Sequence, residues 1–303
     1  MQNFAPIALF VYNRPEHTRR TLKFLKENRL AEESRLFIFS DDAKTSKDED
    51  KVAEVREFIR GVEGFRSVEI IERRNNYGLA NSIIDGVTKL VNEYGKVIVF
   101  EDDLISSPYT LKYFNQGLNR YQYEPKVMHI GAYMYPLEKH DLPEAFFSRI
   151  ATSWGWATWK RAWDQYETDI DKLIEGFDQK KIHAFSIEKS MNFWRQMKEF
   201  KAGKNNSWAI RWYASIFLKG GLSLNPSYSL VNNIGHDGTG IHSGVNDIYN
   251  VRINPNPVLN FPDHIEENKA AYEAIKGFLK KRKGNLLQRA IRFIKSKYSG
   301  KRF

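Results

Sequence analysis

The first 130 residues alternate short apolar segments with longer segments of helical spacing. Short apolar runs predict strands at 6–11, 36–39, 68–71, 97–100 and 127–130. Amphipathic spacing predicts helices at 15–26, 47–59, 79–94 and 109–121, and further helices at 181–201 and 208–219. Because parallel strands need a crossover connection that is usually a helix, this alternation predicts an α/β fold with a mostly parallel sheet and right-handed crossovers.

Three carboxylates follow the apolar strand predicted at 97–100. Glu101, Asp102 and Asp103 are consecutive, and they would repel one another unless a cation lay among them. The carboxyl ends of strands in an open α/β sheet are also where ligands bind. Mg²⁺ and Mn²⁺ prefer oxygen ligands and are often shared between carboxylates and phosphate. The motif therefore indicates a divalent metal that holds a phosphorylated substrate, the alternative being a solvated acidic turn.

Missing residue types and motifs disfavour other classes of protein. The chain has no cysteine, which excludes disulfides, thiolate metal sites and cysteine nucleophiles. No G-x-G-x-x-G or G-x-x-x-x-G-K-[ST] motif follows a predicted strand, which disfavours dinucleotide oxidoreductases and P-loop NTPases. Residues 1–12 lack the basic start of a signal peptide, and no apolar stretch approaches the roughly 20 residues that span a bilayer. We therefore expect a soluble or peripheral protein in the cytoplasm.

Positive charge is concentrated at the C-terminus. The chain has a formal net charge of +10, and residues 276–302 hold 11 Lys and Arg residues and no acid. The rest is close to neutral, so we expect no nucleic-acid partner. Leu287, Ile291 and Ile294 recur at helical spacing among these basic residues, which predicts a basic amphipathic helix on an anionic membrane surface. The alternatives are a solvated tail and a tail that packs on the main domain.

Two segments of the second half carry candidate binding groups. Four tryptophans fall within ten residues, namely Trp154, Trp156, Trp159 and Trp163. Their flat faces suit sugar rings, and the alternative is a core wedge between two subdomains. Residues 232–244 contain four glycines together with His236, Asp237 and His242. This composition is typical of a mobile loop that approaches a metal or a phosphate.

Taken together, these segments resemble a metal-dependent glycosyltransferase of the GT-A fold. The likeness is to the eukaryotic N-acetylglucosaminyltransferases that begin hybrid N-glycans and to bacterial relatives in surface-polysaccharide synthesis. It covers roughly residues 5 to 245 in ordered pieces. The pieces are 7–14 with 18–20, Phe39 to Asp41, 97–104 with Pro108 and Tyr113-Phe114, Trp154 to Trp156, and Gly235 to Gly244.

The resemblance implies roles for the residues of the nucleotide-sugar side. Asp103 would bind Mn²⁺ or Mg²⁺ directly, while Asp102 and Glu101 would contact the ribose or position the other metal ligands. Asp41 would face the nucleotide base, and Arg14 would reach the nucleotide end of the site. The resemblance thus implies a nucleotide-diphosphate sugar as the donor.

Further roles fall on the loop and on the acceptor side. His236 would lie in the loop that closes over the donor, where it would meet the diphosphate or the metal. Trp154 and Trp156 would line the acceptor, with Arg211 nearby. The acceptor implied is a hydroxyl of a glycan or of a lipid-linked glycan.

Two positions depart from the family pattern. Residues 205–211 contain no carboxylate, although the family carries there an acid that serves as the catalytic base. Asp237, the acid nearest the loop, is the substitute candidate. Asn76 stands where the family has a histidine near the nucleotide, so a UDP-sugar is favoured but the base is open.

The resemblance therefore implies an inverting hexosyl- or N-acetylhexosaminyltransferase of surface-polysaccharide synthesis. Residues 1–265 would form the GT-A domain, with a nucleotide-sugar-binding half at 1–131 and an acceptor-binding half at 132–265. Residues 266–303 would form a basic helical tail, which would place the enzyme on the inner face of the cell membrane. The alternatives are a sugar nucleotidyltransferase, disfavoured because residues 13–16 are not a glycine-rich basic loop, and a non-catalytic adaptor for membranes or polyanions.

Overall fold

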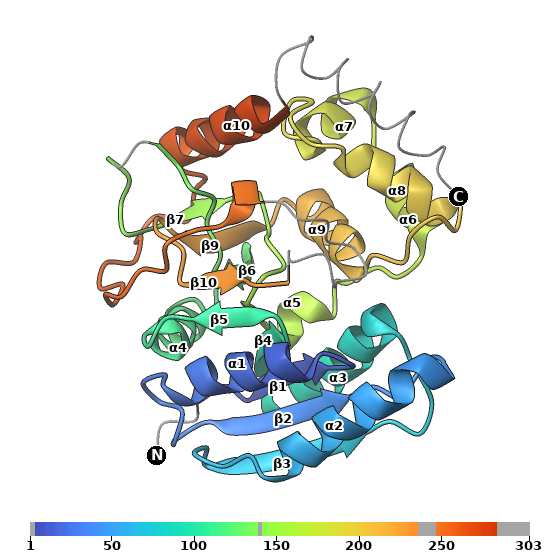
Figure 1. The fold of residues 1–303 in the computed structure, drawn as a ribbon. Helices are drawn as coiled ribbons and strands as arrows, with labels where there is room; N and C mark the ends of the chain where they lie inside the picture. Colours follow the sequence, from blue (N-terminus) through green and yellow to red (C-terminus); the bar gives the residue numbers. More distant parts are fainter. Residues whose placement is uncertain (1–3, 139–140, 236–246, 284–303) are drawn as a thin grey trace.

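A mixed α/β architecture is seen in the computed structural model, which describes residues 4–138, 141–235 and 247–283. Within these residues the centre is an eight-stranded sheet of order β3-β2-β1-β4-β8-β6-β9-β7 (Figure 1). Its strands are β1 (Ile7–Val11), β2 (Arg35–Ser40), β3 (Ser67–Glu72), β4 (Lys96–Glu101), β6 (Val127–Gly131), β7 (Ala145–Ser148), β8 (Trp156–Trp159) and β9 (Leu222–Pro226). All run in one direction except β7 and β8. The predicted mostly parallel sheet is therefore confirmed.

Helices cover both faces of this sheet (Figure 1). They are α1 (Pro15–Lys26), α2 (Glu49–Arg60), α3 (Leu79–Tyr94), α4 (Thr110–Arg120), α5 (Lys160–Trp163), α6 (Ile170–Glu175), α7 (Gln179–Phe185), α8 (Phe193–Lys201), α9 (Trp208–Leu218) and α10 (Lys269–Lys283). Successive strand residues point to opposite faces. Accordingly Ile7 and Leu9 of β1 pack with α1, α2 and α4, whereas Ala8 and Phe10 pack with α3, α5 and α9.

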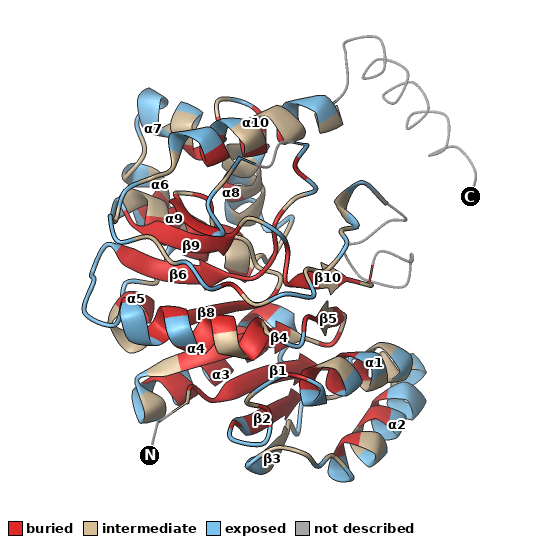
Figure 2. Cartoon of the chain, turned by 90° about the vertical axis from the view of Figure 1, so that its left-hand side faces the viewer, coloured by how far each residue is buried: buried red, intermediate tan, exposed pale blue. Residues whose placement is uncertain are grey.

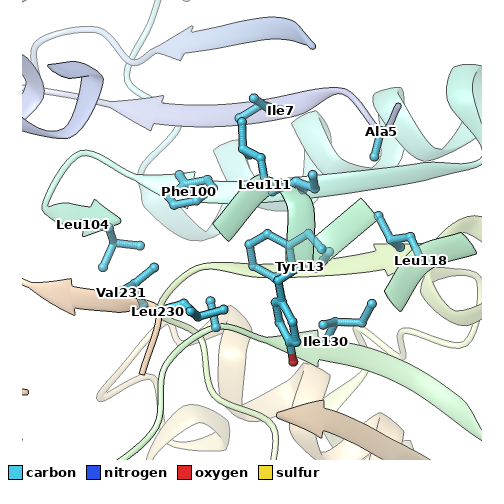
Figure 3. Close-up of a cluster of buried hydrophobic side chains, with 14 of the residues drawn as sticks. Ala5, Ile7, Phe100, Leu104, Leu111, Tyr113, Leu118, Ile130, Leu230 and Val231 are labelled. Atoms are coloured by element: carbon cyan, nitrogen blue, oxygen red, sulfur yellow. The ribbon is translucent and has the colours of Figure 1, made fainter. Parts of the chain in front are cut away.

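One buried cluster fixes the end of β4 against the second half of the sheet. Figure 3 shows Tyr113 of α4 among side chains that include Phe100 of β4 and Ile130 of β6. The Tyr113 hydroxyl donates to the carbonyl of Gly131 at 3.2 Å. Figure 2 shows that the strands are largely buried, while the helices carry their exposed residues on the outside. The carboxyl ends of β4 and β6 are thus held at the same edge of the sheet, on either side of β8.

The helix boundaries follow local sequence signals where such signals exist. α1 and α3 have the predicted bounds, because Pro15 fits the first turn of a helix and Gly95 ends α3 in the left-handed conformation, with φ 75°. The single helix predicted at 181–201 is wrong. That segment forms α7 and α8 with a break between them.

Tertiary contacts cause this break. Ile187, Glu188 and Lys189 adopt positive φ values of 49°, 50° and 66°, a conformation that is costly for residues other than glycine. Ile187 is fully buried against α10, and Glu188 forms an ion pair with Lys276 of α10 at 2.9 Å. Packing against α10 therefore outweighs the helical spacing of the sequence.

α10 packs on the rest of the chain. Its Ala271, Ile275 and Leu279 are buried with Phe146 of β7 and with Ile187. The predicted tail thus begins as a docked helix, and residues 284–303 lie outside the described residues. Among the described residues, we find no helix that combines the length and apolar character needed to cross a membrane.

A buried histidine links the sheet to the segment that precedes β8. His129 of β6 is fully buried, and its ring stacks on Trp156 at 5.5 Å between centroids. Trp212 Nε1–H donates to His129 Nδ1 at 3.1 Å, so the ring proton lies on Nε2 and is donated to the Thr152 carbonyl at 3.0 Å. Burial lowers the pKa of His129 to about 3, opposed by the bond to Thr152.

This histidine should make the protein less stable in acid. The folded pKa of about 3 lies below the ordinary value of 6.5. The contribution of His129 is therefore complete above pH 6.5 and is lost as the pH falls towards 3, because only the unfolded chain takes up the proton in that range. We expect a loss on the order of 4 kcal/mol in the free energy of unfolding between pH 7 and pH 3. Urea unfolding of His129→Gln should lack this component, whereas the exposed His264→Gln should keep it; equal pH dependence of the two variants would contradict the prediction.

Candidate active site

The three carboxylates lie at the carboxyl end of β4, beside the end of β1. The two strands pair in parallel, with Glu101 opposite Phe10. The backbone N–H of Tyr12 donates to Asp102 Oδ2 at 3.3 Å, and the hydroxyl of Thr21 donates to the Asp102 carbonyl at 2.8 Å. The cluster therefore occupies the sheet edge at which open α/β folds bind ligands.

Arg14 completes this cluster. It directly precedes α1 in the chain, and its Nη1 lies 3.0 Å from Oδ2 of Asp103 in an ion pair. Both side chains are mostly buried, with exposed fractions of 15% and 17%. The fold thus brings together two residues that are 89 positions apart, namely the predicted metal ligand Asp103 and Arg14, which is predicted to reach the nucleotide end of the site.

The carboxylates are crowded electrostatically. Burial, then the charges of Asp103 and Asp102, raise the pKa of Glu101 well above its ordinary value. Burial, then Asp103, raise the pKa of Asp102 to about 7, and Arg14 opposes the rise. The single positive charge of Arg14 therefore does not neutralise this cluster once all three carboxylates are ionised. A bound cation would lower both pKa values.

The donor atoms fit Mn²⁺ or Mg²⁺. They are carboxylate oxygens, the ligands that these cations prefer. Among the described residues, no group of three His, Asp or Glu side chains converges closely enough to enclose a metal by itself. Asp103, with Asp102 or Glu101, would therefore hold the cation together with oxygens of a bound phosphate. His236, the other predicted ligand, lies outside the described residues.

A small second sheet attaches the chain before residue 236 to Asp103. β5 (Leu104–Ser106) directly follows the acids and pairs with β10 (Val231–Asn233). The N–H of Ile234 donates to the Asp103 carbonyl at 2.8 Å. A Cβ built on Gly235 would overlap the Asp103 carboxylate and lie 2.9 Å from both Nη atoms of Arg14. The chain therefore passes position 235 in contact with the cluster, and Asp237 lies outside the described residues.

Asp41 and Asn76 come together at the ends of β2 and β3. Asp41 Oδ1 accepts from the N–H groups of Tyr77 at 2.8 Å and Asp42 at 3.0 Å. Its Oδ2 accepts from Gly78 N–H at 2.8 Å and from the Asn76 amide at 3.2 Å. A carboxylate has about four acceptor sites, so these four donors fill it. Asp41 therefore holds the 76–78 turn and has no acceptor site left for a base.

An exposed aromatic ring beside this turn was not predicted from the sequence. Tyr77 is 43% exposed, and the guanidinium of Arg73 lies 4.4 Å from its ring centroid. A flat exposed ring next to Asn76 suits a planar ligand group. A single tyrosine in a turn carries no sequence signal of such a role.

Trp156 is a core residue, which corrects its predicted place in the acceptor site. Its side chain is 0% exposed. The ring stacks on Trp208 at 5.1 Å and on His129 at 5.5 Å between centroids. Because successive residues of β8 point to opposite faces of the sheet, the Trp156 ring points to the face that α9 covers. Trp156 therefore belongs to the core, as the alternative interpretation predicted.

The structure separates the other two predicted acceptor residues. Trp154 is half-buried and lines a cavity. Arg211 is nearly buried at 6% exposure, and its guanidinium lies 4.4 Å from the ring centroid of Phe200. Its Nη1 donates to the carbonyl of Thr168 at 3.3 Å. Arg211 therefore supports the packing around α9 and does not line the cavity.

The cavity beside Trp154 has a volume of about 440 Å³. Its aromatic walls are Tyr133, Tyr135, Trp154, Phe193, Tyr213 and Tyr249. Sequence patterns missed every one of these except Trp154, because they come from five separate segments. Their common position becomes visible only once the fold brings those segments together.

Comparisons with known proteins give weak structural similarities. No family model matches the chain, and no curated protein matches it. The mannosyltransferase PcManGT from Pyrobaculum calidifontis, solved in complex with GDP-Man and Mn²⁺, aligns over 72% of this chain and 69% of its own, with 11% identity and a TM-score of 0.40.

A second match is S. aureus TarS. The structure of TarS 1-349 aligns over 75% of this chain and 59% of its own, with 9% identity and a TM-score of 0.42. The structure of TarS 1-349 in complex with UDP-GlcNAc aligns over 46% of this chain and 37% of its own, with 12% identity and a TM-score of 0.32. This chain thus spans less than two thirds of the TarS chains that it matches. Similarities this low carry no argument about its chemistry, which has to come from the site itself.

Proposed function

We propose that this chain is a GT-A-fold glycosyltransferase that moves a sugar from a nucleotide-diphosphate sugar to a hydroxyl of a glycan or lipid-linked glycan. The observation that carries the proposal is the cluster of Glu101, Asp102 and Asp103 with Arg14, at the carboxyl end of β4. Carboxylates at this edge, with surplus negative charge, suit a cation that is shared with a diphosphate. The ordered sequence resemblance supports the same class.

Charge neutralisation is the main chemical task at such a site. A nucleoside diphosphate leaves readily only when its negative charge is balanced, and a bound Mn²⁺ or Mg²⁺ would supply that balance as a Lewis acid. Asp103 would hold the cation, and Asp102 and Glu101 would position it or contact the ribose. Arg14, which now pairs with Asp103, would add positive charge next to the diphosphate.

The nucleoside would lie at the turn that Asp41 holds. Because its four acceptor sites are filled by protein donors, Asp41 would act by fixing the positions of Asn76 and Tyr77. The exposed Tyr77 ring would stack on the base, and Asn76 would contribute to base choice. A UDP-sugar is the favoured donor.

The acceptor hydroxyl needs a base. We assign this role to Asp237, because residues 205–211 offer no carboxylate. Deprotonation there, with attack on the anomeric carbon opposite the leaving diphosphate, gives a single displacement that inverts the configuration. His236 would meet the diphosphate or the metal from the same segment.

A screen of nucleotide sugars tests this function directly. The full chain is mixed with UDP-, GDP-, CMP- and dTDP-sugars, with and without Mn²⁺, and both donor hydrolysis and thermal shift are followed. We expect one donor class to raise the melting temperature and to be hydrolysed in the presence of Mn²⁺. Neither a shift nor hydrolysis with any donor would contradict the proposal, as would equal hydrolysis without metal.

We also propose that residues 284–303 bind anionic membrane from the cytoplasmic side. The argument is sequence-based, since these residues combine Arg289, Arg292, Lys295 and Lys297 with apolar residues at helical spacing. Each basic residue near an anionic surface contributes about 1 kcal/mol. A peripheral position would suit a lipid-linked acceptor.

Flotation measures this membrane binding. The full chain should float with liposomes that contain phosphatidylglycerol at low salt and should dissociate as salt rises, because the screening length falls to about 3 Å at 1 M. A chain that ends at residue 283 should not float but should hydrolyse the donor as before. Absence of flotation by the full chain at low salt would contradict the membrane role and leave the transferase proposal untouched.

A further inference from the structure

The aromatic cavity lies at the same sheet edge as the acids. β6 runs parallel to β4, so Tyr133 and Tyr135, which follow β6, project from the edge at which the acids follow β4. β8 runs antiparallel to β4, with Trp156 opposite Val99. Trp154 is therefore two residues further towards that edge. The cavity and the acidic cluster thus belong to neighbouring strands of one ligand-binding edge.

The walls of the cavity are aromatic faces with a few neutral polar groups. The rings of Trp154 and Tyr133 are in edge-to-face contact, with centroids 4.5 Å apart. The Tyr133 hydroxyl donates to the carbonyl of Tyr249 at 2.9 Å, which joins two sides of the cavity. Polar lining comes from Thr152, Ser153, Gln196 and Ser207. Aromatic walls with a few convergent polar groups are the usual composition of a small-molecule site.

No charged side chain lines this cavity within the described part of the protein. Burial raises the pKa of Tyr133 and of Tyr135, so their hydroxyls stay neutral at physiological pH. Arg282 lies behind the wall, where its guanidinium contacts Tyr249 and Met191, and it is not itself a lining residue. A carboxylate or phosphate inside would therefore lose its hydration without a direct partner of opposite charge, at a cost of several kcal/mol. The cavity therefore favours an uncharged ligand.

One wall also has an unsatisfied hydroxyl. The Oγ1 of Thr152 is buried and has no hydrogen-bond partner among the described residues. The carbonyl of the same residue is fixed by His129 at 3.0 Å, so this part of the wall is rigid. Because this oxygen is itself buried, a ligand in the cavity does not reach it. Thr152 therefore contributes a rigid wall, and the polar groups left for a ligand are those of Ser153, Gln196 and Ser207.

We infer that this cavity binds an uncharged pyranose ring, the sugar of the acceptor that receives the transferred residue. The C–H face of the ring would pack on Trp154, whose side chain is half-buried, and its hydroxyls would meet Gln196 and Ser153. The volume of about 440 Å³ accommodates one or two such rings. Naming this sugar the acceptor rests on the proposed function, whereas the binding itself does not.

Saturation-transfer difference NMR on the full chain, without nucleotide, tests the binding. The probes are methyl pyranosides of glucose, galactose, mannose and N-acetylglucosamine, with methyl glucuronide as the charged counterpart. We expect at least one neutral probe to bind with a dissociation constant on the order of 1 mM. The glucuronide should bind at least about tenfold more weakly, because its carboxylate finds no partner.

Two pairs of variants locate the binding. Ala209→Phe places a ring in the cavity and should weaken the sugar about tenfold or more, whereas Ala202→Phe, on the exposed end of α8, should not. Gln196→Ala should also weaken it, and the exposed Gln179→Ala should not. If Ala209→Phe disturbs folding, the comparison of Gln196→Ala with Gln179→Ala tests the location of the binding site by itself.

The outcomes separate this inference from the proposed function. Binding of none of the four neutral probes, equal binding of the glucuronide, or unchanged binding by Gln196→Ala would overturn the inference. Donor hydrolysis that depends on Asp103 would still support the transferase proposal in those cases. Neutral-sugar binding without any donor hydrolysis would instead leave a sugar-binding site and contradict the transferase.

Discussion

Asp103→Asn is expected to reduce nucleotide-sugar turnover about 100-fold or more, because neutralisation of the leaving group is usually a large part of such catalysis. Asparagine keeps the shape of Asp103 but removes the charge that would hold the cation. The fold should survive, since Asp103 lies at the sheet edge and its charge repels the neighbouring carboxylates of Glu101 and Asp102, whose pKa values it raises. Donor hydrolysis in Mn²⁺ and the melting temperature together measure the two effects.

A matched acid controls for the change in net charge. Asp164 also forms an ion pair, with Lys160 at 2.7 Å, but it is 48% exposed and lies in no predicted site, so Asp164→Asn should retain full turnover. Excess EDTA should abolish the activity of the wild type. It should reduce the low activity of Asp103→Asn only slightly. Full turnover in EDTA would rule out the metal role of Asp103.

Trp156→Ala is expected to lower the free energy of unfolding by about 3–5 kcal/mol, the usual cost of removing a large buried aromatic side chain. The ring is fully buried between Trp208 and His129, so a cavity would remain. Guanidinium unfolding followed by circular dichroism gives the value. The effect should appear with or without any sugar.

Trp154→Ala is the natural comparison. Trp154 is only half-buried, so we expect a clearly smaller loss of stability and, with it, weaker binding of neutral pyranosides. If Trp156→Ala instead kept its stability and lost sugar binding, Trp156 would have to face the acceptor after all.

Local patterns predicted the first half of the fold because its signals are local. The apolar run of β4 and the acids after it are adjacent in sequence, and so are Gly95 and the end of α3. The break between α7 and α8 has no such signal, because it depends on the contact of Glu188 with Lys276, 88 positions away. The residue pattern of this segment alone therefore could not predict the break.

In the candidate site, too, local sequence signals were predictive and long-range contacts were not. The place of Glu101, Asp102 and Asp103 at a sheet edge was predictable from the strand before them. The side to which Trp156 points was not, because an aromatic residue in a short strand is equally compatible with core and surface. The filled acceptor sites of Asp41 depend on backbone N–H groups whose positions are fixed only by the complete turn.

The contact at position 235 has a consequence for protein engineering. Any side chain there would displace Asp103 and Arg14, so a saturation library at this position should return glycine alone among active clones. An exchange of this loop with that of another enzyme, made to change donor preference, would have to respect this contact. In this chain such an exchange can begin only after Gly235, and grafts that replace it should fail whatever sequence follows.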